Sequence, residues 1–369
     1  MTNRKWIPSI LSAAGLLALI LDSRTGLFAA REGVSLCLTT LVPSMFPFFI
    51  FSMFLTNSLA GQTIKLLHPI VKFCRIPKGA ESLYLIGLLG GYPVGAQNVI
   101  SSYNQGILSA EEAQRMAVFC NNAGPAFLFG YLGTLFDDPA YACVIWTVHI
   151  ISSLLVGWVL PGGTGKTISI QPSHPISVSQ AMNQSIRVMG QVCGWVVLFR
   201  VLIGFLDRWL LWAIPDAFRI LLTGWLELSN GCTMLQNLQS NGLRFIFACS
   251  FLGFGGICVL LQTHSIADNL CLPMYLPGKI LQGSISFLLA IWIQGLLPDA
   301  DPVCVSPVIQ LLVCFGISIL LFILRKQEKP VAISENLLYN QALCEKRRTL
   351  CCFGKKLKNP APTALSAQN

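Results

Sequence analysis

The sequence has few charged residues: Asp, Glu, Lys and Arg make up 11% of its 369 residues, against about 25% in a soluble domain. Hydrophobic residues make up 54% of the chain, and the mean hydropathy is +0.64. This composition excludes an ordinary soluble protein. A bilayer core about 30 Å thick requires about 20 mostly apolar residues per helix, and runs of this length recur along the chain. We therefore predict an all-α polytopic membrane protein.

The sequence also lacks the residue patterns of a catalytic or metal centre. Its 14 cysteines are scattered, with no CxxC pair and no histidine at metal-ligand spacing. It contains no Ser/His/Asp order and no pair of carboxylates within an apolar run. These absences favour a protein that is not an enzyme and that has no cofactor or bound metal. Most cysteines are interpreted as small buried hydrophobic residues, while Cys351 and Cys352 lie in the basic C-terminal region.

Seven apolar runs are long enough to cross a bilayer. They are residues 6–21, 41–59, 116–136, 141–160, 188–211, 278–297 and 303–324. The basic residues Lys65, Lys72, Arg75 and Lys78 follow the second run and favour a cytoplasmic N-terminus. Seven spans would then place the basic C-terminal region outside, contrary to its charge. Either 217–228 forms an eighth span, or one of the seven assignments is wrong.

The positive charge is concentrated at the C-terminal end. Residues 325–369 contain nine Lys or Arg and three Glu, and so contribute +6 of the formal net charge of +9. A basic segment directly after a membrane helix marks the cytoplasmic side and contacts anionic lipid. We therefore expect the bilayer as a partner, no nucleic acid, and a basic disordered tail over 325–369.

Two apolar stretches, 83–101 and 245–262, are interrupted by glycine or proline. The first contains LLGGYPVGAQ and the second FLGFGGICVLLQ. Pro93 removes a backbone donor and clashes with the preceding turn, so a straight helix there would be strained. Irregular backbone at membrane depth is tolerated only where it is buried in protein or lines a wet cavity. We predict a re-entrant hairpin at each stretch; the alternative is close helix packing at the glycines.

The two interrupted stretches divide the chain into two halves. Aligning Gly91 with Gly253 places GYPVGA opposite GFGGIC, and residues 44–55 match 194–205 more loosely. Interrupted apolar segments at corresponding positions of two halves indicate the binding site of a transporter. The predicted organisation is an N-terminal membrane helix (1–24), a first repeat (25–160), a polar linker (161–180), a second repeat (181–324) and the tail (325–369).

Residues 88–130, LLGGYPVGAQNVISSYNQGILSAEEAQRMAVFCNNAGPAFLFG, resemble the first signature block of sporulation integral membrane proteins in the nucleoside-recognition, or Gate, superfamily. FLGFGGICVLLQ resembles the second block, and the resemblance covers about residues 30–325. That superfamily is similar to the concentrative nucleoside transporters. The resemblance implies inverted repeats with paired re-entrant hairpins, an alternating-access cycle and a bacterial cell membrane. The sporulation branch implies passage of dipicolinate, a small aromatic dianion, across a membrane around the forming spore.

One departure from the nucleoside carriers concerns the substrate. Those carriers have Gln, a small hydroxyl residue and Glu at the first hairpin tip, whereas here Gln97 is followed by Asn98 and Val99. Without that carboxylate a grip on sugar hydroxyls is weakened, which favours a small organic anion. A nucleoside transporter and a non-transporting scaffold of spore-envelope assembly are the alternatives.

The candidate substrate-binding residues follow from the interrupted stretches. A helix that begins at a hairpin tip presents free N–H groups and a positive dipole end, which bind anions. The candidates are Gly91, Pro93, Gly95, Gln97, Asn98, Asn121, Asn122, Gly255, Gly256 and Gln262. For Gln97 and Asn98 the alternative is helix capping, and for Asn121 and Asn122 it is hydrogen bonding between helices.

Arg200 lies near the middle of an apolar run, where an ionisable residue is costly and marks a pathway or has a partner. Glu227 is the nearest acidic residue of comparable setting, which predicts an Arg200–Glu227 pair that closes a gate. Alternatively, Arg200 faces a substrate carboxylate or extends to the membrane interface. Coupling to Na⁺ or H⁺ stays open, because half-helix ends and unwound carbonyls hold Na⁺ without a side-chain signature. Homo-oligomers and other sporulation membrane proteins are the expected protein partners.

Overall fold

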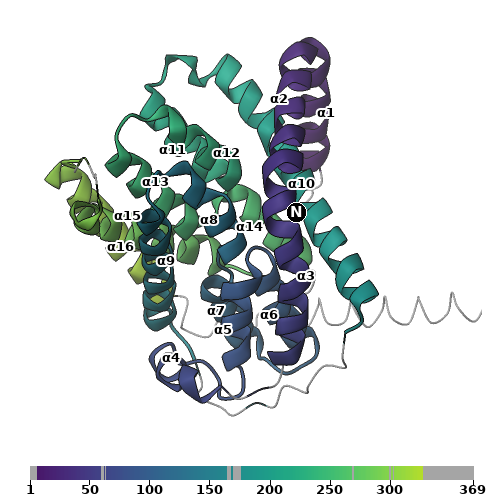
Figure 1. The fold of residues 1–369 in the computed structure, drawn as a ribbon, viewed down its shortest axis with the longest axis vertical. Helices are drawn as coiled ribbons and strands as arrows, with labels where there is room; N and C mark the ends of the chain where they lie inside the picture. Colours follow the sequence, from purple (N-terminus) through teal and green to yellow (C-terminus); the bar gives the residue numbers. More distant parts are fainter. Residues whose placement is uncertain are drawn as a thin grey trace, which may run out of the picture. The chain divides into compact units, whose positions relative to one another are not determined.

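The computed structural model describes residues 6–59, 62, 64–163, 168, 176–267, 270–298, 301 and 303–326. These residues form α-helices and short helical turns, without a strand in the described ranges (Figure 1). The helices are α1 (Trp6–Leu21), α2 (Ser23–Leu36), α3 (Val42–Leu59), α4 (His68–Phe73), α5 (Glu81–Gly90), α6 (Val94–Asn104), α7 (Ala110–Cys120), α8 (Pro125–Gly130), α9 (Pro139–Val159), α10 (Val178–Trp209), α11 (Asp216–Leu226), α12 (Leu228–Met234), α13 (Asn241–Phe254), α14 (Gly256–Ile266), α15 (Tyr275–Ile293) and α16 (Pro307–Lys326). The predicted all-α polytopic class is confirmed.

Six of the described segments are long and apolar enough to cross a membrane. They are Ser23–Leu59, Pro139–Val159, Val178–Trp209, Asn241–Ile266, Tyr275–Leu296 and Pro307–Arg325. The predicted runs at 141–160, 188–211, 278–297 and 303–324 therefore coincide with α9, α10, α15 and α16. The run at 41–59 is the second part of a longer helix, and 6–21 forms the shorter α1. Most of the predicted linker 161–180, and the tail beyond 326 with Cys351 and Cys352, lie outside the described residues.

The predicted span over 116–136 does not form as one continuous helix. Helix α7 ends at Cys120, and the chain is non-helical until α8 begins at Pro125. Proline disfavours helical backbone in the residue before it, and the side chains of Asn121 and Asn122 compete for backbone hydrogen bonds. The suggested eighth span over 217–228 does not form either, because α11 ends at Leu226 and the chain turns back into α12.

The order of elements repeats along the chain. A packed helix pair, a broken helix and a long helix occur as α5–α6, α7–α8 and α9, and again as α11–α12, α13–α14 and α15. Helix α9 begins at Pro139 and α15 at Tyr275, 136 residues later. Each pair is closed by two facing glycines: a Cβ on Gly95 would lie 3.0 Å from the Cα of Gly87. Gly231 contacts Gly224 in the same way.

This repeat corrects the alignment that the sequence suggested. GYPVGA forms the tip of the α5–α6 pair, whereas GFGGIC lies at the break between α13 and α14. Helices α13 and α14 continue along a single candidate span, Asn241–Ile266, so the second predicted hairpin does not form there. The counterpart of the Gly91 tip is Glu227, between α11 and α12. Whether either helix pair is re-entrant in a bilayer stays a prediction, as do the predicted segment boundaries.

Corresponding helices of the two repeats run in opposite directions. The Tyr141 hydroxyl, at the start of α9, donates to the Pro298 carbonyl beyond the end of α15 at 3.1 Å. Near the middle of both helices, the Ser286 hydroxyl donates to that of Ser152 at 2.9 Å. Helix α10 likewise runs antiparallel to α2, because Phe205 lies beside Gly26 near the start of α2. The continuation of α2 into α3 makes α3 antiparallel to α10. This is the geometry expected of an inverted repeat.

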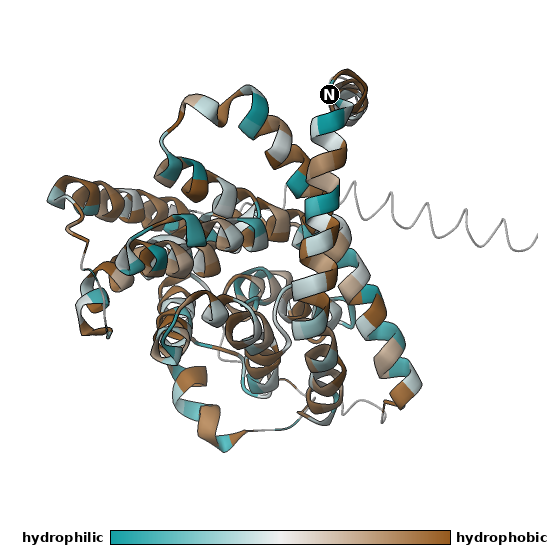
Figure 2. Ribbon diagram, turned by 45° about the horizontal axis from the view of Figure 1, so that its top comes forward, coloured by the Kyte–Doolittle hydropathy of each residue, from teal (hydrophilic) through white to brown (hydrophobic). Residues whose placement is uncertain are grey.

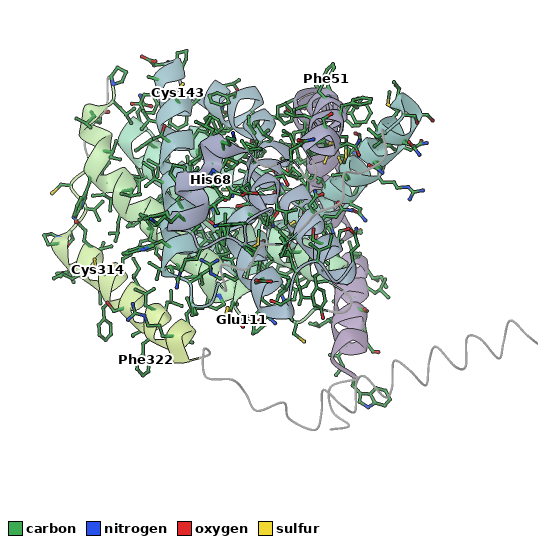
Figure 3. All side chains as sticks on the ribbon, turned by 90° about the horizontal axis from the view of Figure 1, so that it is seen from below. Phe51, His68, Glu111, Cys143, Cys314 and Phe322 are labelled. Carbon is green, nitrogen blue, oxygen red and sulfur yellow. The ribbon has the colours of Figure 1, made fainter. Side chains whose placement is uncertain are left out.

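The buried apolar side chains form two clusters, one toward each end of the long helices. One includes Tyr141 and Leu297, at the start of α9 and beyond α15. The other includes Leu160 just after the end of α9, Leu324 near the end of α16, and Cys74 just after α4. Hydrophobic residues also recur along nearly all the described helices (Figure 2). Figure 3 shows Phe51 and Phe322 on the outside, and they are 73% and 69% exposed. Exposed apolar faces of this kind are suited to lipid.

Candidate functional site

A pocket lies where the two helix pairs meet the two helix breaks. Its cavity volume is about 40 Å³. The lining residues are Met45, Tyr92, Ala123, Gly124, Phe127, Val192, Val196, Glu227, Leu228, Ser229, Val259 and Gln262. They come from α3, α10, both pair tips, the α7–α8 break and α14. The pocket is therefore built by both repeats, with few polar groups in a mostly apolar lining.

Glycines allow the tips and the breaks to come this close. Gly91 has a φ of +73°, and a Cβ on it would lie 3.1 Å from the backbone nitrogen of Gly124 in the α7–α8 break. Gly256, at the start of α14, has a φ of +88°, and a Cβ on it would lie 3.2 Å from the Leu226 carbonyl at the second tip. A Cβ on Gly255 would meet the ring of Tyr92 at 3.1 Å. Larger residues would push the pocket walls apart.

Glu227 is the acidic group of the pocket lining. It is 2% exposed and precedes α12 as its N-cap residue. Its carboxylate accepts hydrogen bonds from the backbone nitrogens of Ser229 at 3.0 Å and Asn230 at 2.7 Å. The side-chain nitrogen of Asn230 also donates to it at 2.6 Å. The positive end of the α12 dipole and these donors stabilise the carboxylate.

A buried polar cluster lies directly behind Tyr92. The Lys279 ammonium, on α15, donates to the Asn121 carbonyl at 2.7 Å, to the Gln282 side chain at 2.8 Å and to the Tyr92 hydroxyl at 3.2 Å. Tyr92 in turn donates to the Leu252 carbonyl of α13 at 2.9 Å. Lys279 is 1% exposed and does not line the pocket. The cluster therefore joins the first tip and the first break to two helices of the second repeat.

Asn121 and Asn122 both belong to this cluster rather than to the pocket lining. The Asn121 side chain accepts from the Ala96 backbone nitrogen at 3.2 Å and donates to the Tyr275 hydroxyl at 2.7 Å. Asn122 donates to the Phe119 carbonyl at 2.7 Å and accepts from Gln282 at 3.2 Å. Both side chains are fully buried. Hydrogen bonding between helices thus accounts for both amides, and the next two residues of the break line the pocket.

Arg115 anchors the middle of α7. It is 1% exposed, and its guanidinium donates to the carbonyls of Cys74, Gly157 and Leu160. Burial lowers the pKa of Arg115 to about 10, so the group stays charged at neutral pH. These contacts fix α7 to the loop before α5 and to the end of α9.

The structure brings some of the predicted residues to the pocket and not others. Gln262 and Glu227 line it, and the glycines at 91, 255 and 256 form the close contacts around it. Pro93 and Gly95 lie inside the first helix pair, with Gly95 against the Cys120 carbonyl. Gln97 is exposed, and Asn98 donates to the Val94 carbonyl of its own helix at 2.8 Å. Substrate binding by any of them stays a prediction.

Arg200 and Glu227 do not pair in this structure. Arg200 forms its ion pair with Glu32 of α2, while Glu227 is bonded to the first turn of α12. The pairing was predicted because both residues lie in apolar segments. Several segments of this chain are apolar, and the sequence does not show which of them are in contact. The Arg200–Glu32 pair links α10 to α2 and lies apart from the pocket lining.

Sequence reasoning missed Tyr92, Lys279 and Gln282 as site residues. One signal was present: Lys279 lies within the apolar stretch LPGKILQGSISFLLA, and an ionisable residue inside a span is a functional candidate in its own right. The partners of Lys279 come from positions up to 187 residues away. The described residues contain no group of three or more His, Cys, Asp or Glu side chains that could hold a metal ion.

Among the described residues, six apolar segments are long enough to cross a membrane and most of them have exposed hydrophobic faces, which defines the class: the chain is a multi-pass bacterial membrane protein. It is similar to the sporulation integral membrane protein YlbJ of Bacillus subtilis (strain 168), with 23% identity over 314 residues, covering 72% of this chain and 77% of the relative. This similarity confirms the predicted resemblance to sporulation integral membrane proteins. No family model matches the chain. No solved structure matches it. The nucleoside-recognition superfamily stays a prediction.

Proposed function

We propose that this protein is a membrane carrier that moves a small organic solute by alternating access during spore formation. One observation carries the proposal: the pocket lies between two antiparallel repeats and is lined by both helix-pair tips, by the α7–α8 break of the first repeat and by α14 of the second. Interrupted helices at the interface of inverted repeats are the binding-site arrangement of many secondary transporters. A scaffold that only holds partner proteins has no need of a pocket at this position.

In this proposal both helix pairs are re-entrant, and their tips meet near the middle of the bilayer. The irregular backbone at residues 121–124 is buried in protein, which is the condition for tolerating it at membrane depth. Alternating access then consists of opening one tip from its break while the other stays closed. The glycine contacts at Gly91 and Gly256 are the surfaces that separate.

The first candidate substrate is a small organic anion such as dipicolinate, as the sporulation resemblance implies. The pocket offers such a ligand an apolar wall and the Gln262 amide, and its cavity of about 40 Å³ must widen before the ligand can enter. A nucleoside is the second candidate, and Glu227 favours it, because a carboxylate accepts hydrogen bonds from sugar hydroxyls. The acid missing from the first tip thus has a counterpart at the second tip.

Glu227 also separates the two substrates experimentally. We would measure uptake of labelled dipicolinate and labelled uridine into proteoliposomes carrying the protein or its Glu227→Gln variant. Removing the negative charge should raise the apparent affinity for an anion. It should instead lower uridine uptake by about tenfold or more, the equivalent of one lost hydrogen bond to a charged group.

The matched control is Glu111→Gln, an exposed acid on α7 outside the pocket (Figure 3). This variant should transport as the unmodified protein does. Gln262→Ala should reduce uptake of whichever compound is the substrate. Folded protein that takes up neither compound, under Na⁺ or proton gradients, would contradict the carrier and favour the scaffold.

A further inference from the structure

The α7–α8 break leaves backbone carbonyls without a partner in the helix, and such carbonyls bind a cation in other carriers. The last carbonyls of a helix have no partner within it and carry the negative end of its dipole. In transporters with broken helices, half-helix C-termini and unwound carbonyls coordinate Na⁺. Here α7 ends at Cys120, and Asn121 is the first unwound residue, with a buried carbonyl.

That carbonyl is already occupied by a side chain. The ammonium of Lys279 donates to it at 2.7 Å and approaches from α15 in the second repeat. Its two other bonds go to Gln282 and to Tyr92 at the first tip. An ammonium has three N–H donors, so all of them are used within the protein and none is left for a substrate carboxylate.

The positive charge of Lys279 is balanced by the helix end rather than by an acid. The ion pairs of the described residues join Arg200 to Glu32 and Arg219 to Asp216, and neither includes Lys279. A buried cation needs compensation, and the C-terminal end of α7 with the Asn121 carbonyl supplies it. The ring of Tyr92, 5.1 Å from the ammonium nitrogen, adds a cation–π contact and separates Lys279 from the pocket.

We infer that the Lys279 ammonium is a tethered cation that takes the place of a coupling Na⁺ at the α7–α8 break. The inference rests on the proposed carrier function and concerns its coupling: the first tip is held closed by a charge that belongs to the protein. Transport and folding therefore do not require Na⁺. Deleting the side chain should create a site for a small monovalent cation between Asn121, Gln282 and Tyr92.

The first test uses the unmodified full-length protein in detergent. Its Tm is measured by tryptophan fluorescence in NaCl and in choline chloride at equal ionic strength. We expect the same Tm in both salts. A saturable rise of Tm with Na⁺ would overturn the inference, because it would show that a Na⁺ site exists while Lys279 is in place.

The second test uses Lys279→Ala, with Lys72→Ala at an exposed position of α4 as the matched control. Lys279→Ala should lower Tm by about 5 °C in choline chloride, since it leaves buried acceptors unpaired. Methylammonium or Na⁺ should restore at least half of this loss, with saturable concentration dependence. The control should show neither effect. A folded Lys279→Ala protein that responds to neither cation would overturn the inference, and if that variant does not fold, the salt comparison on the unmodified protein decides.

Uptake separates this inference from the proposed function. Dipicolinate or uridine uptake should be equal in Na⁺ and choline gradients. No uptake in either gradient, with Tm behaving as expected, would contradict the carrier but leave Lys279 as a structural cation. Uptake at least tenfold faster in the Na⁺ gradient would support the carrier and overturn the Na⁺ independence.

Discussion

The two helix pairs share one topology but are held in different ways. The tip of α5–α6 is bonded to the second repeat, through Tyr92 to Lys279 and to the Leu252 carbonyl. The tip of α11–α12 is bonded mainly to itself, because Glu227 caps its own helix. Outside contacts of α12 include the Tyr131 hydroxyl, which contacts the Ser229 carbonyl at 3.2 Å. The comparison indicates that the first tip is the more strongly anchored wall and the second is the more mobile one.

The largest expected effect tests whether the pairs are equivalent in packing. Gly95→Leu places a side chain against the Cys120 carbonyl, and Gly231→Leu places one against Gly224. Because backbone atoms cannot move aside, each should lower the yield of monodisperse protein by about tenfold or more. Gly190→Leu is the control, since a Cβ there meets nothing within 4 Å. Normal yield of one pair variant would show that its glycines are not a required contact.

The second prediction concerns the relative mobility of the pairs. In lipid nanodiscs, amide hydrogens of 216–234 should exchange with deuterium about tenfold faster than those of 81–104, because Glu227 at the second tip bonds within its own helix, whereas Tyr92 at the first tip bonds to the other repeat. Mass spectrometry of the peptides from both segments measures this ratio. Peptides from α9 give the slow reference. Equal protection of the two segments, or faster exchange in 81–104, would reverse the assignment of the more mobile wall.

The third prediction compares single hydroxyl groups. Tyr92→Phe leaves the Leu252 carbonyl unbonded and removes one acceptor of Lys279, which should cost about 1–3 kcal/mol of stability. Tyr131→Phe should cost less, about 1 kcal/mol, because the Ser229 carbonyl keeps its bond from Thr233 at 3.0 Å. Thermal unfolding followed by tryptophan fluorescence gives both values. A larger loss for Tyr131→Phe would mean that the second tip is the better anchored one.

The smallest effect belongs to a pair outside both tips. The Arg200 and Glu32 side chains are 21% and 41% exposed, so breaking their ion pair with Arg200→Ala should cost only about 0.5–1 kcal/mol. The double swap Glu32→Arg with Arg200→Glu should recover the Tm lost by Arg200→Glu alone. Recovery by Glu227→Arg instead would restore the gate pairing that the sequence suggested.

The sequence predicted the all-α class and most membrane helices because an apolar run of about 20 residues has few stable structures other than a membrane-spanning helix. It also located the breaks at Gly91–Pro93 and Gly255–Gly256. It predicted a hairpin at both breaks, and a helix pair forms at the first but not at the second, because glycine and proline interrupt a helix whether the chain turns back or continues. The helix pair around Glu227 was missed because α11 and α12 are short and contain no proline.

The site was predicted less well, for a physical reason. Gln262 lines the pocket, and the sequence identified it as a candidate because it follows the glycine break at Gly255–Gly256. The partners of Lys279 and Arg200 are tertiary: Asn121 lies 158 residues before Lys279, and Glu32 lies 168 residues before Arg200. A single sequence shows that a buried charge needs a partner, but it does not show which partner folding supplies.

The apolar cluster that joins Leu324 to Cys74 and Leu160 relates the end of α16 to the predicted orientation of the protein. It places the end of α16 at the same end of the helices as the loop with the basic residues of 65–78. From the excess of Lys and Arg we expect that end to lie in the cytoplasm, and this orientation would remove the conflict over the basic C-terminal region. Because the repeats are antiparallel, α5–α6 then enters from the cytoplasm and α11–α12 from the opposite face. A solute in the pocket would then contact one helix pair that enters from the cytoplasmic side and one that enters from the opposite side.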